Sequence, residues 1–367
     1  MKNLIEAPER YPINATFELT VRCNLRCKMC LFRHDDKENS SIIKKELTAE
    51  QWISLARQAA EMGTGGILIT GGEPMLRPDF CEIYENIYRL GFMISLYTNA
   101  VLVTPQTMEV LRKYPPHKIG VSIYGASAET YEKVCGNADA FQKMLDGCKQ
   151  LCSLPSVIEF RTTIIKDNFE DSRAIEKLVK ENFGEQHSVT CTRMVMKAVR
   201  GACADVESCR LSPEQNVKLS LQRSIDILRE RIGDGFDERN IRIHRENLRK
   251  NADCASSAEK KYSLFGCSGG MSAYAVTWDG KLQACQALGA FYTDAVNLGL
   301  KEAWDTFPLA VKLPKVSEKC LNCKMNKICQ SCYALRYAET GDVSGCPEYA
   351  CADSEVMNSY IIMEGSE

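Results

Sequence analysis

Short apolar segments alternate with longer amphipathic segments from residue 12 to about residue 196. The short segments are rich in β-branched residues and predict strands at 16–20, 66–70, 93–98, 118–124, 157–165 and 188–196. The longer segments repeat apolar residues at helical spacing and predict helices at 48–62, 79–90, 105–114, 126–134, 139–151 and 170–181. Strands and helices that alternate in this way form a parallel sheet or barrel. The pattern therefore predicts an α/β fold with six βα units, two short of a complete barrel.

Two of the predicted strands carry polar residues on one face. Ser122 and Tyr124 alternate with apolar residues along one strand, and Glu159 and Arg161 do so along the next. A closed barrel fills its interior with branched apolar side chains, so a polar interior indicates an open barrel that holds a charged ligand. A one-sided amphipathic sheet with its polar face in solvent would give the same pattern. The alternation alone leaves both interpretations open.

The sequence becomes charged and helix-rich after Arg200. Ser212 followed by Pro213 predicts the start of a helix that runs to about residue 232. From Cys254 onward cysteines and glycines are frequent, which indicates a second domain. The boundaries that we predict are 12–205 for the barrel, 206–253 for a helical linker, 254–351 for a small cysteine-rich α+β domain, and 352–367 for a C-terminal tail or helix.

Charge and cysteine content limit the classes of function that the sequence allows. The 367 residues include 46 Lys and Arg and 48 Asp and Glu, a formal net charge of -2, which gives no sign of a nucleic-acid partner. The first residues lack an apolar signal segment, and no long apolar run follows, so we expect a cytoplasmic protein without membrane association. In a reducing compartment, 19 cysteines favour metal ligation over disulfides.

Two motifs lie at the ends of the first two predicted strands. Cys23, Cys27 and Cys30 have C-x3-C-x2-C spacing, and three thiolates can hold three irons of a four-iron cluster while the fourth stays open. A structural zinc site would need four ligands. Gly71-Gly72-Glu73-Pro74 ends the second strand. Glycines there let the backbone approach a ligand, and a glutamate can accept a bond from an ammonium group, although an ordinary turn would have the same residues.

The two motifs together resemble those of the radical S-adenosylmethionine (radical SAM) superfamily. The resemblance implies a partial (β/α)6 TIM-like barrel, with a 4Fe–4S cluster on Cys23, Cys27 and Cys30. S-adenosylmethionine would bind the open iron. The residues that would hold its amino group are Gly71, Gly72 and Glu73, and those that would reach its ribose or carboxylate are Asn99, Ser122 and Arg161. Arg161 has an alternative role as the partner of Glu159.

More cysteines cluster near the C-terminus. Residues 274–282 predict a hairpin with its turn at Asp279-Gly280, which would bring Cys267 and Cys285 together. The later cysteines are Cys320, Cys323, Cys329, Cys332, Cys346 and Cys351. Taken alone, their two C-x2-C pairs also suit a zinc ribbon.

Downstream of a radical SAM barrel, this pattern resembles the SPASM extension, a cysteine-rich domain with auxiliary iron–sulfur clusters. One interval departs from the family spacing, because two residues rather than three separate Cys329 and Cys332. The resemblance implies two auxiliary clusters. The ligands of the first would be Cys267, Cys285 and Cys332, and those of the second would be Cys320, Cys323, Cys329 and Cys351. Cys346 is an alternative to Cys351. Cys254 is a candidate fourth ligand of the first cluster, which could instead keep an open iron for a substrate thiolate.

The resemblance also implies an activity and its partners. Residues 124–131 resemble those of the peptide-modifying subgroup, so we expect a 5′-deoxyadenosyl radical to abstract hydrogen from a ribosomally made precursor peptide and to yield a thioether or carbon–carbon crosslink. A flavodoxin- or ferredoxin-type protein would donate electrons. Only 22 residues precede Cys23, so leader recognition would use the barrel mouth, the linker or a separate leader-binding protein. The alternatives are an anaerobic sulfatase-maturating (formylglycine-forming) enzyme, oxidative dehydrogenation of a small molecule, and a zinc or iron–sulfur interaction module. No catalytic base is assigned.

Overall fold

The computed structural model describes residues 9–254, 265, 267–311, 318–325, 328–329 and 331–362. These residues divide into two compact units. The first unit comprises the chain up to Cys209 together with the described residues from Phe265 to Val311. The second unit comprises the chain from Arg210 to Cys254 and the described residues from Glu318 onward.

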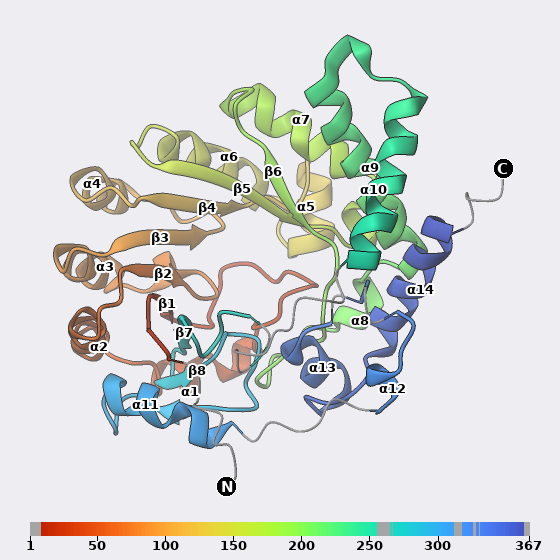
Figure 1. The fold of residues 1–367 in the computed structure, drawn as a ribbon. Helices are drawn as coiled ribbons and strands as arrows, with labels where there is room; N and C mark the ends of the chain where they lie inside the picture. Colours follow the sequence, from red (N-terminus) through yellow and green to blue (C-terminus); the bar gives the residue numbers. More distant parts are fainter. Residues whose placement is uncertain are drawn as a thin grey trace, which may run out of the picture. The chain divides into compact units, whose positions relative to one another are not determined.

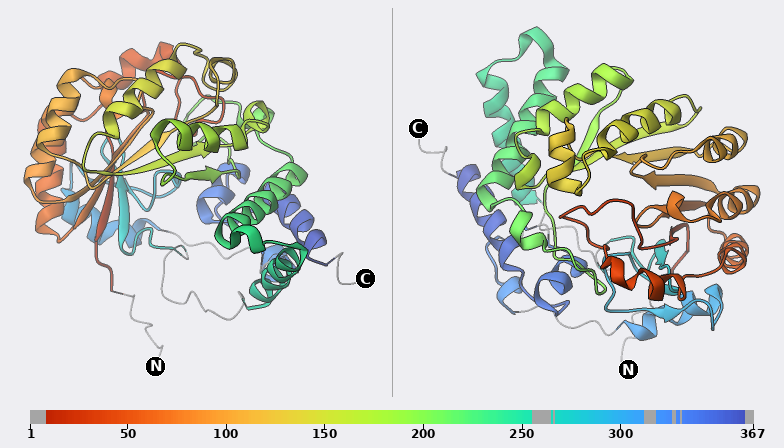
Figure 2. Two further views of the ribbon diagram at one scale, coloured as in Figure 1. Left: turned by 90° about the horizontal axis from the view of Figure 1, so that it is seen from above. Right: turned by 180° about the vertical axis from the view of Figure 1, so that it is seen from behind.

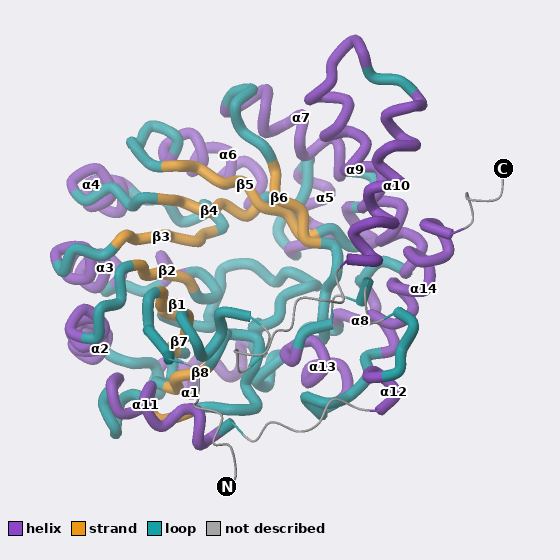
Figure 3. The backbone as a smooth tube through the Cα atoms, in the orientation of Figure 1, coloured by secondary structure: helices purple, strands orange, loops and turns teal. Residues whose placement is uncertain are grey.

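A sheet of nine strands forms the centre of the first unit, as Figure 3 shows in orange. Its strands are β1 (Asn14–Glu18), β2 (Gly66–Thr70), β3 (Met93–Thr98), β4 (Lys118–Ser122), β5 (Val157–Thr163), β6 (Val189–Thr192), β7 (Ala273–Val276), β8 (Lys281–Gln283) and β9 (Thr293–Asp294). Strands β1 to β6 are parallel and lie in sequence order across the sheet. The predicted α/β class and partial barrel are confirmed.

Helices follow the strands and cover the outer face of the curved sheet (Figures 1 and 2). The helices of this unit are α1 (Asn39–Ile43), α2 (Ala49–Glu61), α3 (Phe80–Arg89), α4 (Pro105–Lys113), α5 (Ala128–Cys135), α6 (Ala140–Leu151), α7 (Ser172–Phe183), α8 (Val206–Cys209) and α11 (Leu300–Ala310). The six predicted barrel helices are confirmed within two residues at each end.

Helix α2 illustrates how the sequence forms these elements. Thr48 and Gln51 form a capping box, in which each side chain bonds to the backbone N–H of the other. The apolar face of the helix then buries Trp52, whose ring lies 5.1 Å from that of Phe17 on β1. On the sheet itself, alternate residues such as Ile69 of β2 point into the same core. The core of this unit therefore lies between sheet and helices.

The predicted hairpin at 274–282 is present as β7 and β8, with Gly280 in the left-handed region at φ 85°. Strand β7 also pairs in parallel with β1, so the hairpin extends the barrel sheet. The predicted domain boundary at residue 254 therefore does not coincide with the division of the structure. The physical reason is that β1 would otherwise leave a row of unpaired backbone groups at the sheet edge.

The second unit is helical. Its helices are α9 (Pro213–Ile232), α10 (Glu238–Cys254), α12 (Glu318–Leu321), α13 (Tyr333–Thr340) and α14 (Glu348–Ile362). Ser212 caps α9 with Pro213 in its first turn, as predicted. Helices α9 and α14 pack together, and the buried hydroxyl of Tyr349 accepts a hydrogen bond of 2.6 Å from the amide of Asn216. No helix among the described residues is long and apolar enough to cross a membrane.

Candidate active site

The loop after β1 carries the three cysteines that the sequence predicts as cluster ligands, Cys23, Cys27 and Cys30. Two backbone hydrogen bonds fix the middle of this loop on the last turn of α5. The N–H of Arg26 donates to the carbonyl of Cys135 over 2.8 Å, and the N–H of Lys28 donates to that of Val134 over 3.0 Å. The loop therefore has a fixed path without regular secondary structure of its own.

Arg22 anchors the start of the same loop. Its Nε and Nη2 atoms donate to the two oxygens of the Glu46 carboxylate over 2.9 and 2.8 Å. The hydroxyl of Thr20 also donates to this carboxylate. Because Arg22 precedes Cys23 directly, this paired charge holds the first cysteine close to the end of β1.

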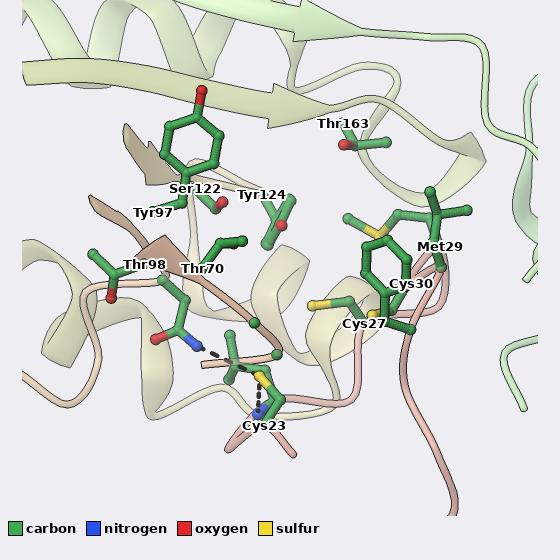
Figure 4. A pocket seen from close by; sticks show the side chains of 16 residues that line it. Cys23, Cys27, Met29, Cys30, Thr70, Tyr97, Thr98, Ser122, Tyr124 and Thr163 are labelled. Atoms are coloured by element: carbon green, nitrogen blue, oxygen red, sulfur yellow. Dashed lines mark hydrogen bonds between the residues drawn. The ribbon is translucent and has the colours of Figure 1, made fainter. Parts of the chain in front are cut away.

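A cavity lies at the carboxyl ends of the parallel strands, and all three cysteines of the loop line it (Figure 4). The hydroxyl groups that line it belong to Thr70, Tyr97, Thr98, Ser122, Tyr124 and Thr163. None of the described residues around the cavity has a side chain with a formal charge at neutral pH. The predicted polar inner face of the barrel is therefore real, and it surrounds a cavity.

Gly71 and Gly72, which the sequence predicts as cofactor-binding residues, line this cavity. Both also lie directly against the backbone of the preceding strand end. A Cβ on Gly71 would be 2.5 Å from the carbonyl oxygen of Thr20, and a Cβ on Gly72 would be 2.3 Å from that of Arg22. Glycine is therefore required here to let the ends of β1 and β2 approach each other.

Glu73 lies fully buried beside these glycines, but its side chain is not among those that line the cavity. Its carboxylate accepts hydrogen bonds from the N–H of Asn99 over 2.8 Å, from the N–H of Met75 over 3.1 Å and from the hydroxyl of Thr98 over 2.9 Å. Burial raises the pKa of Glu73 to about 7, although these three donors lower it. In this structure Glu73 joins the ends of β2 and β3.

Asn99 and Ser122, two further predicted cofactor residues, both line the cavity. The amide of Asn99 donates to the side-chain oxygen of Asn24 over 2.9 Å and to the sulfur of Cys23 over 3.6 Å. The N–H of Leu25 also donates to that sulfur, over 3.4 Å. Two donors thus point at the first predicted ligand.

Arg161, the last predicted cofactor residue, is not among the described residues that line the cavity. Its guanidinium lies 4.5 Å from the centre of the Tyr97 ring and donates to the Tyr97 hydroxyl. It also forms an ion pair of 3.7 Å with Glu159, the alternative partner that the sequence suggests. Arg161 therefore supports Tyr97, which lines the cavity.

The sequence predicts no site role for Thr70, Tyr97 or Thr163, and it places Tyr124 only on the polar inner face of the barrel. The strand alternation was the signal that could have found them, because inward-facing residues near the carboxyl end of each barrel strand reach the same cavity. Gly120 adds to this signal. A Cβ on Gly120 would be 2.5 Å from the Tyr97 ring, so the glycine leaves space for that ring inside the barrel.

Of the three loop cysteines, Cys27 is buried and Cys23 and Cys30 are half-buried. Burial raises the pKa of Cys23 and raises that of Cys30 to about 11. The pKa of Cys27 is raised because its thiol hydrogen-bonds with that of Cys135, and burial adds to the effect. At neutral pH these thiols therefore keep their protons until a metal displaces them.

Two of the C-terminal cysteines, Cys267 and Cys285, belong to the first unit and are exposed. Gly269 follows Cys267 by two residues and lies against Ala284, the residue before Cys285. A Cβ on Gly269 would be 3.3 Å from the sulfur of Cys267 and 3.1 Å from the carbonyl oxygen of Ala284. The hairpin thus brings these segments together, as predicted. Cys332, the third member of this predicted set, belongs to the second unit, and the side chain of Cys254 lies outside the described residues.

The other predicted ligands lie in the second unit, where three thiols meet. The sulfur of Cys346 is 3.0 Å from that of Cys351, and the Cys346 thiol also hydrogen-bonds with Cys320. Burial raises the pKa of Cys346 to about 12. Cys323 accepts a bond from the N–H of Met325 over 3.3 Å, and Cys329 donates to the hydroxyl of Ser331 over 3.3 Å. Cys346 and Cys351, the two candidates for the last ligand of the second auxiliary cluster, thus lie next to each other.

Comparisons with known proteins bear on this site. Residues 17–179, which include the cysteine loop and the cavity, match the Radical SAM superfamily. The matched residues of this chain therefore form a radical SAM domain. Such a domain implies a 4Fe–4S cluster and S-adenosylmethionine.

The chain is similar to two curated proteins along most of its length. An AdoMet-dependent heme synthase from Methanosarcina barkeri is 29% identical over 337 residues, which cover 89% of this chain and 92% of the relative. An Fe-coproporphyrin III synthase from the same organism is 26% identical over 341 residues, which cover 87% of this chain and 82% of the relative.

Two solved structures share the fold. SuiB from Streptococcus suis has a TM-score of 0.67 at 17% identity, covering 93% of this chain and 77% of SuiB. The native protein anSMEcpe with bound AdoMet has a TM-score of 0.65 at 17% identity, covering 95% of this chain and 96% of that protein. Similarity at these identities demonstrates a common fold alone.

The described residues fit a 4Fe–4S cluster. Among them, the thiols of Cys23, Cys27 and Cys30 line one cavity. Cluster ligands bind separate irons, so thiols that stand apart around a space match this chemistry. The N–H groups of Leu25 and Asn99 that point at Cys23 would stabilise a thiolate there.

Proposed function

We propose that this radical SAM enzyme modifies a ribosomally made precursor peptide by forming a thioether or carbon–carbon crosslink. The observation that carries this choice is the uncharged cavity. Hydroxyl, amide and apolar side chains surround it, and such a lining suits a peptide segment, whose backbone needs hydrogen bonds rather than counter-ions. The structure of SuiB bound to the precursor peptide SuiA supports the proposal at the level of the fold.

The residues around the cavity have separate roles in this proposal. Cys23, Cys27 and Cys30 ligate the cluster. Gly71, Gly72 and Glu73 border the amino group of S-adenosylmethionine, Asn99 and Ser122 reach its ribose or carboxylate, and Arg161 acts on that end through Tyr97. When bound, the cluster and S-adenosylmethionine supply reductive cleavage of the sulfonium and abstraction of a hydrogen atom from the substrate.

The C-terminal cysteines form a SPASM-type site in this proposal. Cys267, Cys285 and Cys332 hold one auxiliary cluster, and Cys320, Cys323, Cys329 and Cys351 hold another. Crosslink formation removes two hydrogen atoms from the peptide: one leaves as an atom, and the other leaves as a proton and an electron. Auxiliary clusters on these cysteines would supply an acceptor for that electron, which a closed-shell product requires.

Two protein partners belong to the proposal. A flavodoxin- or ferredoxin-type donor supplies the electron for each turnover. A separate leader-binding protein presents the precursor peptide. Both are tested by adding the partner to the purified enzyme and measuring the rate of peptide modification.

A second candidate is oxidative modification of a carboxylated tetrapyrrole. The similarity to the heme synthase and the Fe-coproporphyrin III synthase covers most of each chain and favours it. Against it stands the uncharged cavity lining, because several substrate carboxylates would need cationic partners.

One experiment separates the two candidates. The anaerobic enzyme is incubated with S-adenosylmethionine and a reductant, either with a short cysteine-containing peptide or with iron coproporphyrin III. We expect the peptide to lose the mass of two hydrogen atoms while the porphyrin stays unchanged. Loss of carbon dioxide from the porphyrin with an unchanged peptide would replace the first candidate by the second.

Matched cysteine variants control this experiment. Cys27→Ala removes a predicted cluster ligand and should abolish the mass change. Cys81→Ala removes a half-buried thiol on α3 that does not line the cavity and should leave the mass change intact.

A further inference from the structure

A buried carboxylate on β1 has no role in the site described so far. Glu18 is the last residue of β1, and its side chain has an exposed fraction of 0%. The guanidinium of Arg200 donates to both of its oxygens, over 2.8 and 2.6 Å. The amide of Gln286 donates to one of the same oxygens over 2.8 Å. Glu18 is therefore held by two side chains that come from distant parts of the chain.

These contacts connect two places where cysteines are predicted to bind clusters. Gln286 directly follows Cys285, a predicted ligand of the first auxiliary cluster. The guanidinium of Arg200 lies 4.7 Å from the centre of the Phe32 ring, and Phe32 lines the cavity two residues after Cys30. The carboxylate of Glu18 thus lies between the cavity wall and the loop that carries Cys285.

The backbone is adapted to this arrangement. Arg200 has φ 56°, in the left-handed region that residues other than glycine rarely adopt. A Cβ on Gly289, in the same loop as Cys285, would be 2.8 Å from the Cγ atom of Arg200. A strained residue persists where the surrounding contacts hold it, and such residues concentrate at functional sites.

We propose that Glu18, Arg200 and Gln286 form a clamp that positions the Cys285 loop at a fixed distance from the radical SAM cavity. The proposal rests on the auxiliary-cluster part of the proposed function. Electron transfer between metal centres depends steeply on their separation, so a loop that carries a cluster ligand needs a rigid attachment to the barrel. Gln286 is the side chain that links the buried ion pair to this loop, and all three are positioning residues.

The test measures amide hydrogen exchange in the full-length protein, both as purified anaerobically and after iron is removed with a chelator. In Gln286→Ala, exchange at residues 285–290 should rise by at least about tenfold, because the loop loses a hydrogen bond to a charged group. The control is Gln58→Ala, whose side chain accepts a bond of 2.7 Å from the N–H of Leu300. This control should raise exchange near Leu300 and leave residues 285–290 unchanged.

Two further variants keep the result interpretable. Arg200→Lys retains the charge but loses the paired hydrogen bonds, and it should raise exchange in the same segment. Arg210→Lys weakens a comparable ion pair in the second unit, where Arg210 lies 2.9 Å from Glu339, and should leave that segment unchanged. Unchanged exchange at 285–290 in both Gln286→Ala and Arg200→Lys would overturn the clamp.

A spectroscopic arm separates this proposal from the proposed function. In the reduced holoprotein, Gln286→Ala should weaken or broaden the magnetic coupling between the clusters, whereas Gln58→Ala should not. Equal coupling in wild type and Gln286→Ala would contradict the positioning role. If the wild-type protein holds a single cluster, the auxiliary-cluster function fails, while the exchange data still decide whether the clamp exists.

Discussion

At the scale of single residues, the backbone after β2 is hydrogen-bonded to the backbone at the start of the cysteine loop. The N–H of Gly72 donates to the carbonyl of Thr20 over 2.7 Å, and the N–H of Glu73 donates to that of Arg22 over 2.9 Å. These bonds lie directly before Cys23. A side chain at Gly72 would therefore displace backbone that the first cluster ligand depends on.

Gly72→Ala tests this contact. Its Cβ would be 2.3 Å from the carbonyl oxygen of Arg22, so we expect a loss of about 1 to 3 kcal/mol in the free energy of unfolding and reduced iron retention. Chemical denaturation and iron analysis measure both. Gly65→Ala is the control, because no atom lies within 4 Å of its Cβ position. Equal effects in the two variants would contradict the argument.

The buried carboxyl of Glu73 gives a pH-dependent prediction. Burial raises its folded-state pKa from 4.5 to about 7, so the folded protein binds this proton more tightly than the unfolded chain. The associated stability is fully present below about pH 4.5 and is lost as the pH rises through about 7. The difference amounts to at most about 3.5 kcal/mol, at roughly 1.4 kcal/mol per pKa unit.

Glu73→Gln removes this titration while keeping an acceptor oxygen. The free energy of unfolding of the iron-free wild type, minus that of the variant, should therefore fall between about pH 4.5 and 7. Denaturation series across this range measure the difference. A difference that stays constant, or rises, would mean that Glu73 is ionised throughout.

The sequence identified some site residues and missed others for a physical reason. Cys23, Cys27 and Cys30 lie close in sequence, so local spacing alone reveals them. Tyr97 and Thr163 lie on different strands and meet only because both face inward near the same sheet edge. Their side chains are common in strands everywhere, so no local pattern distinguishes them before the register of the sheet is known.

At the scale of elements, the cysteine loop depends on α5. The last turn of that helix accepts two hydrogen bonds from the loop backbone, and Gly136 ends the helix in the left-handed region at φ 68°. The thiol of Cys135, in the same turn, hydrogen-bonds with that of Cys27. Cys135 thus lies next to a predicted cluster ligand.

Cys135→Ala tests the contact between helix and loop. A hydrogen bond to a cluster-ligating sulfur raises the reduction potential, so its loss should lower the midpoint potential of the radical SAM cluster. A redox titration followed by EPR measures this potential. Cys148→Ala removes an equally buried thiol, which hydrogen-bonds with Met144 in α6, and should leave the potential unchanged. The same shift in both variants would point to general loosening of the core.

Most barrel elements were predictable because each has its own local signal. Thr48 caps α2, and alternating isoleucines mark β2, so these elements were found with nearly correct ends. The pairing of β7 with β1 was not predictable, since a four-residue strand contains nothing that specifies its neighbour. The pairing depends on β1 lying at the free edge of the sheet that β1 to β6 form, and all of these strands precede β7 in the chain.

At the scale of the whole molecule, the two units carry different parts of the proposed chemistry. The cavity and its three cysteines belong to the first unit, and the thiols of Cys320, Cys346 and Cys351 meet in the second. The two groups can therefore be tested independently, by replacing cysteines in one unit and analysing the iron that remains.

Iron analysis of such variants is a further prediction. The wild type should hold about twelve irons per chain, four for each of three clusters. Cys351→Ala should lower this number, and Cys346→Ala should not, if Cys351 is the last ligand. The opposite result would assign that role to Cys346, which lies 3.0 Å away. Acid-labile sulfide, measured in parallel, should fall in proportion to iron.

Cys23, Cys27 and Cys30 are expected to support radical chemistry on S-adenosylmethionine. The most direct measurement is the amount of 5′-deoxyadenosine formed under reducing, oxygen-free conditions by the wild type and by a variant with all three cysteines changed to alanine. We expect 5′-deoxyadenosine from the wild type, and none from the variant although it retains iron in its C-terminal region. No 5′-deoxyadenosine from a fully loaded wild type, or equal amounts from both proteins, would contradict the account.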